Sequence, residues 1–288
     1  MERSLRPGNI TWRWKRSLLL LAILLGALFV AGRITARHLM ETLALTTGPN
    51  GPQTPASEGV PFERVLIPSG PRRLDSYVVT AASGCVDPPV ILIYHGVGET
   101  ISEWVKAQRF LYQHCVSSVV YDPTGSGNSS RPARFEDEAE DSIAAYDFAV
   151  HHFPGRRLYL LGHSMGNGPM LESAPRMAPQ PAGVVIASAF ASLRSQPRTR
   201  GNPLYRLLSY TIPDWWNNVK AVAAIHVPVL IVHSDVDRVN PTQGGLQIYA
   251  AAHQPKTLAL LHGFTHNALY QQPTEAWWSP VLSFVRAP

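Results

Sequence analysis

Cysteine is scarce in this sequence, with two residues among 288. Two cysteines are too few for a disulfide-stapled miniprotein or for a cysteine-based zinc module. Charged residues are also few, at 16%, whereas hydrophobic residues make up 45%. This composition excludes overall intrinsic disorder and provides for a sizeable core. The length allows one large domain or two small ones.

Two motifs of metal and cofactor chemistry are missing as well. The sequence contains no H-E-x-x-H, which disfavours a zinc hydrolase, and no G-x-G-x-x-G follows its first strand, so a nicotinamide site has no support. The histidine pair at 151–152 lacks ligand spacing and a carboxylate partner. We therefore expect neither a metal nor an organic cofactor.

The net charge of +5 is concentrated at the N-terminus. Residues 1–37 contain seven Lys and Arg and one acidic residue, whereas the other 251 residues hold 18 basic and 19 acidic groups. A nucleic-acid surface would need the excess charge on the folded domain, so we expect no nucleic-acid partner. The basic N-terminal segment instead indicates membrane targeting.

Residues 17–32 form an uncharged apolar run of 16 residues. As a helix this run would rise about 24 Å, a little short of the roughly 30 Å hydrocarbon core, and flanking tryptophans and arginines can cover the difference. We predict an uncleaved membrane anchor within residues 1–37, with a cleaved signal peptide as the alternative. Basic residues before the run predict a cytoplasmic N-terminus and an extracytoplasmic domain, periplasmic or luminal.

After the anchor, residues 38–61 are rich in proline and glycine and lack an apolar period, which predicts a flexible linker.

From residue 62 to 288, short apolar runs alternate with helical stretches. The runs at 62–67 and 74–80 predict a leading strand pair, and six further runs predict buried parallel strands at 90–94, 118–121, 158–161, 184–187, 229–232 and 257–261. Helices are expected near 101–114, 136–152, 165–177, 204–223, 242–252 and 274–286. This alternation predicts an open α/β sheet, with chemistry at the carboxyl ends of its strands.

The motif G-x-S-x-G stands between an expected strand and an expected helix. It reads G-H-S-M-G at residues 162–166 and directly follows the apolar run 158–161. The two glycines allow a tight turn that lifts Ser164 to the top of the sheet. The backbone N–H of Met165 can then point at a developing oxyanion. The alternative is a tight turn with an inert serine.

A nucleophilic serine needs a general base, and that base needs an orienting acid. In this type of fold the chain order is serine, acid, histidine. The segment H-S-D-V-D-R-V at 233–239 and the segment H-G-F-T-H-N at 262–267 each follow an expected strand. An acid and a histidine therefore come after Ser164 in the required order.

On these motifs the chain resembles an α/β-hydrolase, in particular the small-lidded, membrane-anchored serine hydrolases of the bem46-like group, over about residues 62–286. The shared motifs are H-G, D-x-x-G-x-G-x-S, G-H-S-x-G, H-G-x-x-D and a late G-x-x-H. Here they fall at residues 95–96, 122–129, 162–166, 233–237 and 263–266. The resemblance implies a mostly parallel sheet flanked by helices, with a small cap.

The resemblance also implies the roles of five residues. Ser164 is the expected nucleophile, Asp237 the acid and His266 the base. The backbone N–H groups of Val97 and Met165 are the expected oxyanion donors.

Neighbouring residues offer alternatives to these roles. Ser234 stands where the resembled family prefers glycine, and Asp235 is the alternative acid. We expect His262 to pack at a strand end, His163 to support the site from beneath, and Asp122 to shape its loop without acid–base work.

Cys85 and Cys115 each precede one of two strands that are parallel neighbours in the resembled fold. A disulfide between them would agree with an oxidising compartment, and two buried thiols are the alternative.

The cap is expected at about residues 190–225, which leaves room for one or two short helices. Its apolar and aromatic content, close to a bilayer, suggests an acyl chain or another apolar substrate group, although the same side chains could simply pack the cap onto the sheet. They are Phe190, Leu204, Tyr205, Leu207, Leu208, Tyr210, Ile212, Trp215 and Trp216.

The sequence therefore predicts a membrane-tethered serine hydrolase that cleaves carboxylic esters or thioesters of acyl or lipid-like substrates through an acyl-enzyme. One alternative is an aminopeptidase or amidase on the same scaffold, which would need an acidic pocket for a free amine. The other is a catalytically silent, membrane-anchored binding protein with the same fold. No sequence feature indicates an oligomeric state.

Overall fold

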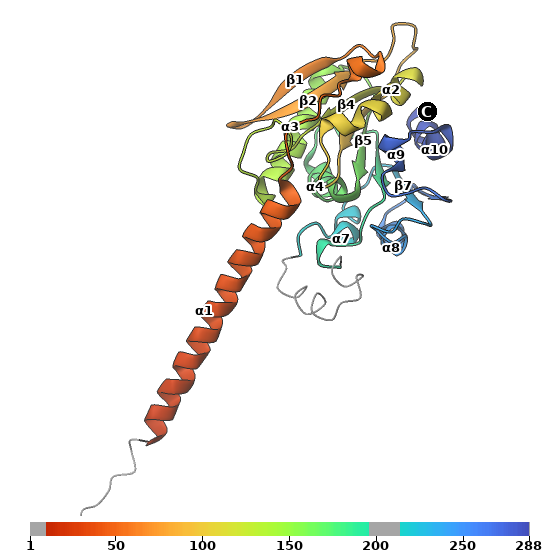
Figure 1. Cartoon of the computed structure of the whole chain (residues 1–288). Coiled ribbons are helices and arrows are strands. Elements are labelled where there is room, and N and C mark those ends of the chain that lie inside the picture. Colours follow the sequence, from red (N-terminus) through yellow and green to blue (C-terminus); the bar gives the residue numbers. More distant parts are fainter. Residues whose placement is uncertain (1–9, 196–213, 288) are drawn as a thin grey trace, which may run out of the picture.

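An eight-stranded mixed sheet forms the centre of the domain (Figure 1). The structure is a computed structural model and describes residues 10–195 and 214–287 of the chain. Each strand overlaps one of the eight predicted from the sequence, so these predictions are confirmed. The strands are β1 (Glu63–Ser69), β2 (Arg72–Val79), β3 (Val90–Tyr94), β4 (Ser117–Tyr121), β5 (Leu158–His163), β6 (Gly183–Ala187), β7 (Val229–Ser234) and β8 (Lys256–Leu261).

The strand order is β1-β2-β4-β3-β5-β6-β7-β8. Strand β2 runs antiparallel to β1 and β4, and every pair from β4 to β8 is parallel. The carboxyl ends of β3, β5, β7 and β8 therefore meet at one edge of the sheet. The loops that follow these ends carry the residues singled out from the sequence.

Helices cover both faces of the sheet, as the crossover connections of parallel strands require. One apolar cluster joins α3, α4, α7 and α8 to one face, and a second joins α2, α9 and α10 to the other. Strands β3, β5, β6 and β7 lie between the clusters and are buried along their whole length, which explains their continuous apolar runs. These helices are α2 (Val105–Gln113), α3 (Phe135–His152), α4 (Asn167–Ser173), α7 (Asn218–Val222), α8 (Gln243–Ala251), α9 (Ala268–Gln271) and α10 (Glu275–Arg286).

Several helical stretches are more divided than predicted. The stretch expected at 101–114 begins with the 3₁₀ turn η2 (Ile101–Trp104) before α2, and the stretch at 165–177 contains η3 (Ser164–Gly166), α4 and η4 (Ala174–Arg176). Helix α9 was not predicted, because four residues are too few to show a helical period. Of the helix expected at 204–223, residues 204–213 lie outside the described part of the chain, and α7 occupies residues near its end.

Strand β8 differs from the prediction of a strand buried on both faces. Among the described strands it lies at one edge of the sheet and pairs only with β7, and its residues are partly or largely exposed. Leu260, for example, is 45% exposed. An apolar run therefore predicted the strand correctly but not its position at the edge.

Helix α1 (Ile10–Leu45) is much longer than the predicted span of 17–32 and leads away from the domain (Figure 1). Its segment Trp14–Leu39 contains an 18-residue window with a mean hydropathy of 2.3, and none of this window is buried. Within the described residues, this is the one helix whose length and composition would allow it to cross a membrane.

The segment 38–61 packs against the domain, although its composition predicted a flexible linker. Helix α1 continues to Leu45, which is buried in one cluster with Phe135 and Trp216. Beyond it, the backbone N–H of Thr47 donates to the carbonyl of Gly125 (3.3 Å), and η1 (Pro55–Glu58) follows. Proline and glycine end the helix, but the backbone still finds partners on the domain surface.

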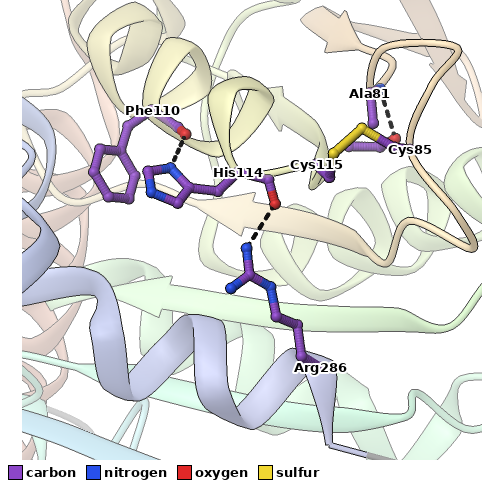
Figure 2. Close-up of a disulfide and its surroundings, with 7 residues drawn as sticks. Ala81, Cys85, Phe110, His114, Cys115 and Arg286 are labelled. Atoms are coloured by element: carbon purple, nitrogen blue, oxygen red, sulfur yellow. Dashed lines mark hydrogen bonds between the residues drawn. A yellow bond between two sulfur atoms is a disulfide. The ribbon is translucent and has the colours of Figure 1, made fainter.

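Cys85 and Cys115 form a disulfide, with their Cα atoms 5.5 Å apart (Figure 2). They precede β3 and β4, which pair in parallel, so the bridge lies at the amino ends of these strands, away from the edge that carries Ser164. Close by, Arg286 near the C-terminus donates to the carbonyl of His114 (2.9 Å). Of the two alternatives for the cysteines, the structure contains the disulfide.

Candidate active site

Ser164 lies at the turn between β5 and η3 with a φ of 51°, in the left-handed region that serine seldom adopts. Two glycines make this turn possible. A Cβ atom on Gly162 would lie 2.6 Å from Oδ1 of Asn167, and one on Gly166 would lie 2.2 Å from the carbonyl oxygen of Tyr94. The G-x-S-x-G segment therefore folds as the sharp strand-to-helix turn that its sequence predicts.

Asp237 and His266 form a hydrogen-bonded pair. Oδ2 of Asp237 is 2.8 Å from Nδ1 of His266, and the Asp237 side chain is fully buried. The backbone N–H groups of Val239 and Asn240 donate to Oδ1 of Asp237, each at 2.9 Å. Burial would raise the pKa of Asp237, but the hydrogen bond and charge of His266, together with these N–H groups, hold it below its usual value. An ionised carboxylate only accepts, so Nδ1 of His266 carries its proton.

Asp235, the alternative acid, pairs with a different histidine. Oδ2 of Asp235 is 2.8 Å from Nδ1 of His262, and the N–H of Gly263 donates to Oδ1 (2.9 Å). The side chains of Asp235 and His262 are 47% and 84% exposed. The prediction that His262 packs at a strand end is therefore wrong, because its pairing with Asp235 holds it in solvent. Of the two acids, Asp237 is the one that lies beside His266.

Asn240 and His163 connect Ser164 to this pair. Nδ2 of Asn240 is 3.4 Å from Oγ of Ser164 and donates to the carbonyl of Ser188 (2.7 Å). His163 precedes Ser164 in the chain, and its ring centroid is 4.8 Å from that of His266. Within residues 10–195 and 214–287, no hydrogen bond joins Ser164 Oγ to His266. Such contacts are often long without substrate and shorten when it binds.

The two expected oxyanion donors border one narrow cavity. Val97 and Met165 both line it, and Val97 is 48% exposed. Gly96, next to Val97, lies so close to Ser164 that an added Cβ would be 3.1 Å from Cβ of Ser164. The loop after β3 and the Ser164 turn are therefore in direct contact.

Glu99 is a buried carboxylate that the sequence interpretation missed. Its Oε1 is 2.9 Å from Nδ1 of His163, and its Oε2 accepts from the N–H of Gly96 and from Nε1 of Trp104, each at 2.9 Å. Nε2 of His163 in turn is 3.1 Å from the carbonyl oxygen of His266. Glu99 thus links the loop after β3, the Ser164 turn and the loop that carries His266. His163 lies beneath the site, as predicted.

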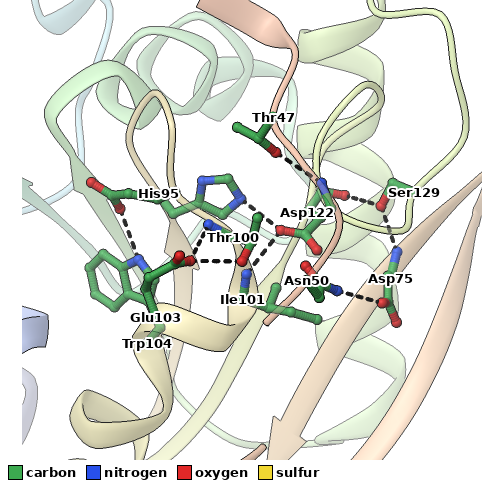
Figure 3. A network of polar contacts seen from close by, with 12 residues as sticks. Thr47, Asn50, Asp75, His95, Thr100, Ile101, Glu103, Trp104, Asp122 and Ser129 are labelled. Atoms are coloured by element: carbon green, nitrogen blue, oxygen red, sulfur yellow. Dashed lines mark hydrogen bonds and ion pairs between the residues drawn. The ribbon is translucent and has the colours of Figure 1, made fainter. Parts of the chain in front are cut away.

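Asp122 shapes the loop after β4 through a polar network (Figure 3). Its Oδ1 accepts from the N–H of Ile101 (2.9 Å) and is 3.2 Å from Nε2 of His95, while Oγ of Ser129 donates to its carbonyl (2.6 Å). Burial would lower the pKa of His95, but the hydrogen bond and charge of Asp122 raise it to about 9. Gly127 packs directly against this carboxylate and leaves no room for a side chain, since an added Cβ would be 2.0 Å from Oδ2 of Asp122. The network supports His95, which precedes Gly96.

The predicted cap is described only at its two ends. Phe190 and Trp216 are buried with Leu45 in one apolar cluster, so they pack the cap onto the domain. The predicted cap residues that lie outside the described residues are Leu204, Tyr205, Leu207, Leu208, Tyr210 and Ile212.

Metal-binding side chains do not gather in the described part of the chain. Among residues 10–195 and 214–287, no group of three or more His, Cys, Asp or Glu is placed to hold a metal ion.

The sequence is similar to a known enzyme family and to several known proteins. The model of the serine aminopeptidase family S33 matches residues 88–221. The lysophosphatidylserine lipase ABHD12 of Danio rerio is 26% identical over 229 residues, covering 69% of this chain and 59% of that protein's length. This protein is an α/β-hydrolase. The hydrolase is also 27% identical over 261 residues to the uncharacterized protein MT2364 of Mycobacterium tuberculosis, covering 88% of the hydrolase and 90% of that protein.

Solved structures share the fold of this hydrolase. The Pyrococcus furiosus esterase Pf2001 superposes with a TM-score of 0.66 at 17% identity, covering 84% of the hydrolase and 97% of the esterase. A membrane phospholipase A, described as a bacterial virulence factor, superposes with a TM-score of 0.60 at 18% identity, covering 97% and 100%. At such low identity the likeness concerns the fold alone.

Proposed function

We propose that this hydrolase is a membrane-tethered serine hydrolase that cleaves carboxylic esters or thioesters through an acyl-enzyme. The observation that carries the proposal is the buried 2.8 Å hydrogen bond between Asp237 and His266, next to the turn that presents Ser164. A serine on a strained strand-to-helix turn, with a histidine and an orienting carboxylate at the same sheet edge, is the arrangement of nucleophilic acyl transfer.

Five residues take part in the proposed reaction. Oγ of Ser164 attacks the carbonyl carbon while Nε2 of His266 takes the hydroxyl proton, and Asp237 stabilises the resulting imidazolium. The N–H groups of Val97 and Met165 donate to the tetrahedral oxyanion. His266 passes its proton to the leaving alcohol or thiol. Water, activated by the same histidine, then cleaves the acyl-enzyme, releases the carboxylic acid and restores Ser164.

Acyl or lipid-like substrates are supported by what lies around the site. Leu45, at the end of α1, lines the same cavity as Val97 and Met165. If α1 spans a membrane, the site lies close to the bilayer and can receive apolar molecules from it. The similarity to a protein named lysophosphatidylserine lipase agrees with this substrate class.

Labelling by a fluorophosphonate probe tests the nucleophile. We expect the wild type to be labelled, Ser164→Ala to lose labelling entirely and His266→Ala to be labelled far more slowly, because only an activated serine attacks phosphorus. Ser283→Ala, a change at an exposed position on α10, serves as the matched control and should label like the wild type. Labelling that survives in Ser164→Ala would identify another nucleophile. A folded wild type without labelling would favour the catalytically silent binding protein.

The Cys85–Cys115 disulfide offers a test of the proposed extracytoplasmic orientation. Disulfides persist in oxidising compartments and are rare in the cytosol. We therefore expect both thiols to resist alkylation when cells are quenched and denatured without reductant, and to react after reduction. Full alkylation without reductant would place the domain in the cytoplasm and contradict the orientation.

A further inference from the structure

Glu138 is a buried carboxyl group, and one of its two oxygens lacks a hydrogen-bond partner among the residues that the structure describes. It lies in the first turn of α3 and is 4% exposed, and the unpartnered oxygen is Oε1. Its neighbours in the same turn are paired, Asp137 with Arg72 (2.9 Å) and Glu136 with Arg37. Buried polar groups are nearly always hydrogen-bonded, so an orphan of this kind calls for an explanation.

The Glu138 side chain lines the same narrow cavity as Val97 and Met165, which the proposed function makes the oxyanion donors. The cavity has a volume of about 20 Å³, which is enough for one group the size of a water molecule or an ammonium ion. Tyr94 and Tyr121 form part of its wall, and their rings pack edge to face at 5.5 Å. A single small polar group could therefore reach Glu138 while the rest of its molecule lies at the reaction centre.

The positively charged side chains near Glu138 are already paired with other carboxylates. From its own helix Asp137 and Asp141 face it, and from the sheet side Arg72 and His95 do. Arg72 is paired with the two aspartates, at 2.9 and 3.0 Å, and His95 with Asp122 at 3.2 Å. Burial, followed by the charge of Asp141, raises the pKa of Glu138 to about 8. Without a ligand, this carboxyl group is mostly protonated at neutral pH.

We propose that this cavity binds a primary ammonium group of the substrate, so that the hydrolase acts on esters, thioesters or amides that carry a free amine near the scissile bond. The position of the amine relative to that bond rests on the proposed function. A primary ammonium supplies what Glu138 lacks, since it donates charge-assisted hydrogen bonds to a carboxylate. The tyrosine rings add cation–π attraction. A hydroxyl group of the same size would supply the hydrogen bond but not the charge.

Calorimetric titration of the full-length protein in a non-ionic detergent, at constant ionic strength, tests the proposal. The probes are n-butylammonium chloride and 1-butanol, which differ in charge but hardly in size. We expect the wild type to bind butylammonium about tenfold or more tightly than butanol, as one charge-assisted hydrogen bond implies. Glu138→Gln should lose this preference. Glu140→Gln, an exposed position on the same helix, is the matched control and should keep it.

The release of protons on ligand binding gives a second readout. Because ammonium binding should ionise Glu138, the wild type should release close to one proton per bound butylammonium at pH 7, measured in buffers of different ionisation enthalpy. Its affinity should also rise between pH 6 and 8, a range in which the Arg72 pairs keep their charge. In Glu138→Gln both effects should vanish. Equal binding of butylammonium and butanol by the wild type, or an unchanged preference in Glu138→Gln, would overturn the proposal.

Neither readout depends on Ser164, so the ammonium site and the hydrolytic function can fail separately. Ammonium binding without fluorophosphonate labelling would keep this proposal and remove the proposed function. Labelling without ammonium binding would keep the proposed function and remove this proposal.

Glu138→Leu adds a measurement of stability. It should raise the melting temperature of the ligand-free protein, because it removes a buried oxygen that has no hydrogen-bond partner among the described residues. A clear fall would assign Glu138 a structural role and contradict the proposal.

Discussion

Asp237→Asn should lower kcat/KM for ester hydrolysis by about 1,000- to 10,000-fold with little change in KM. The asparagine side chain fits the same space, but its oxygen would accept from the N–H groups of Val239 and Asn240, so its NH2 group would face Nδ1 of His266. The histidine would then lack a proton on Nδ1, and no carboxylate would stabilise the imidazolium of the proposed reaction. Asp237 is fully buried, and its contact with His266 measures 2.8 Å, so no water can replace it without rearrangement. Initial rates with a p-nitrophenyl ester, at saturating and limiting concentrations, measure the effect.

Asp235→Asn is the matched control for this variant. The two aspartates are two residues apart, each is hydrogen-bonded to a histidine at 2.8 Å, and they differ mainly in burial and in the histidine they hold. Because Asp235 and His262 are largely exposed, we expect kcat/KM to stay within about threefold of the wild type, as for a surface ion pair. A large loss in Asp235→Asn and a small one in Asp237→Asn would reverse the assignment of the acid.

Glu99→Ala should lower the free energy of unfolding by about 3–5 kcal/mol, the cost typical of removing one partner from a buried ionic network. The change leaves three buried donors without their acceptor, on Gly96, Trp104 and His163. Urea titration of the detergent-solubilised protein, followed by tryptophan fluorescence, measures this loss. Glu103→Ala, four residues further on and exposed, is the control. It loses only the contacts at the N-terminus of η2 and should cost about 1 kcal/mol.

The contribution of Glu99 should depend on pH. Burial would raise the pKa of Glu99, but the charge and hydrogen bond of His163, with the charge of His95 and the N–H of Gly96, lower it to about 2. A lowered pKa in the folded state stabilises the fold above the unfolded value near 4.5, and this stabilisation is lost as the pH falls towards 2. The difference in unfolding free energy between the wild type and Glu99→Gln should therefore shrink as the pH falls below 4. A difference that grows on acidification would contradict this account.

Local patterns were sufficient to predict the sheet. The runs at 90–94 and 158–161 are continuous and apolar because β3 and β5 have neighbours on both sides and helices on both faces. The same pattern misled at β8, which has one neighbour and is partly exposed. It also misled at 38–61, where glycine and proline suggested a free linker. In both places the outcome depends on which surface the segment meets, and composition does not carry that information.

Some residues of the candidate site were predicted from the sequence, and others were found only in the structure. The order of Ser164, Asp237 and His266 along the chain could be read from the motifs, and the structure brings Asp237 and His266 into contact beside the Ser164 turn. Their catalytic roles remain predictions for the experiments above. Glu99 and Asn240 were missed, because neither stands in a motif and each acts by contacting two or three different loops.

The sequence by itself determined the α/β architecture, the strained serine turn and the long apolar helix at the N-terminus. All three follow from interactions between residues close in the chain: apolar periodicity, glycines that permit a φ or a close contact, and uninterrupted hydrophobicity. Only the tertiary structure decided which aspartate meets His266, that the two cysteines are bonded, and that Glu138 is buried in the cavity beside Val97 and Met165, with its Oε1 unpartnered among the described residues. These outcomes depend on how loops from separate strands converge at one sheet edge. Burial and distance there are set by residues far apart in the chain, so no local pattern encodes them.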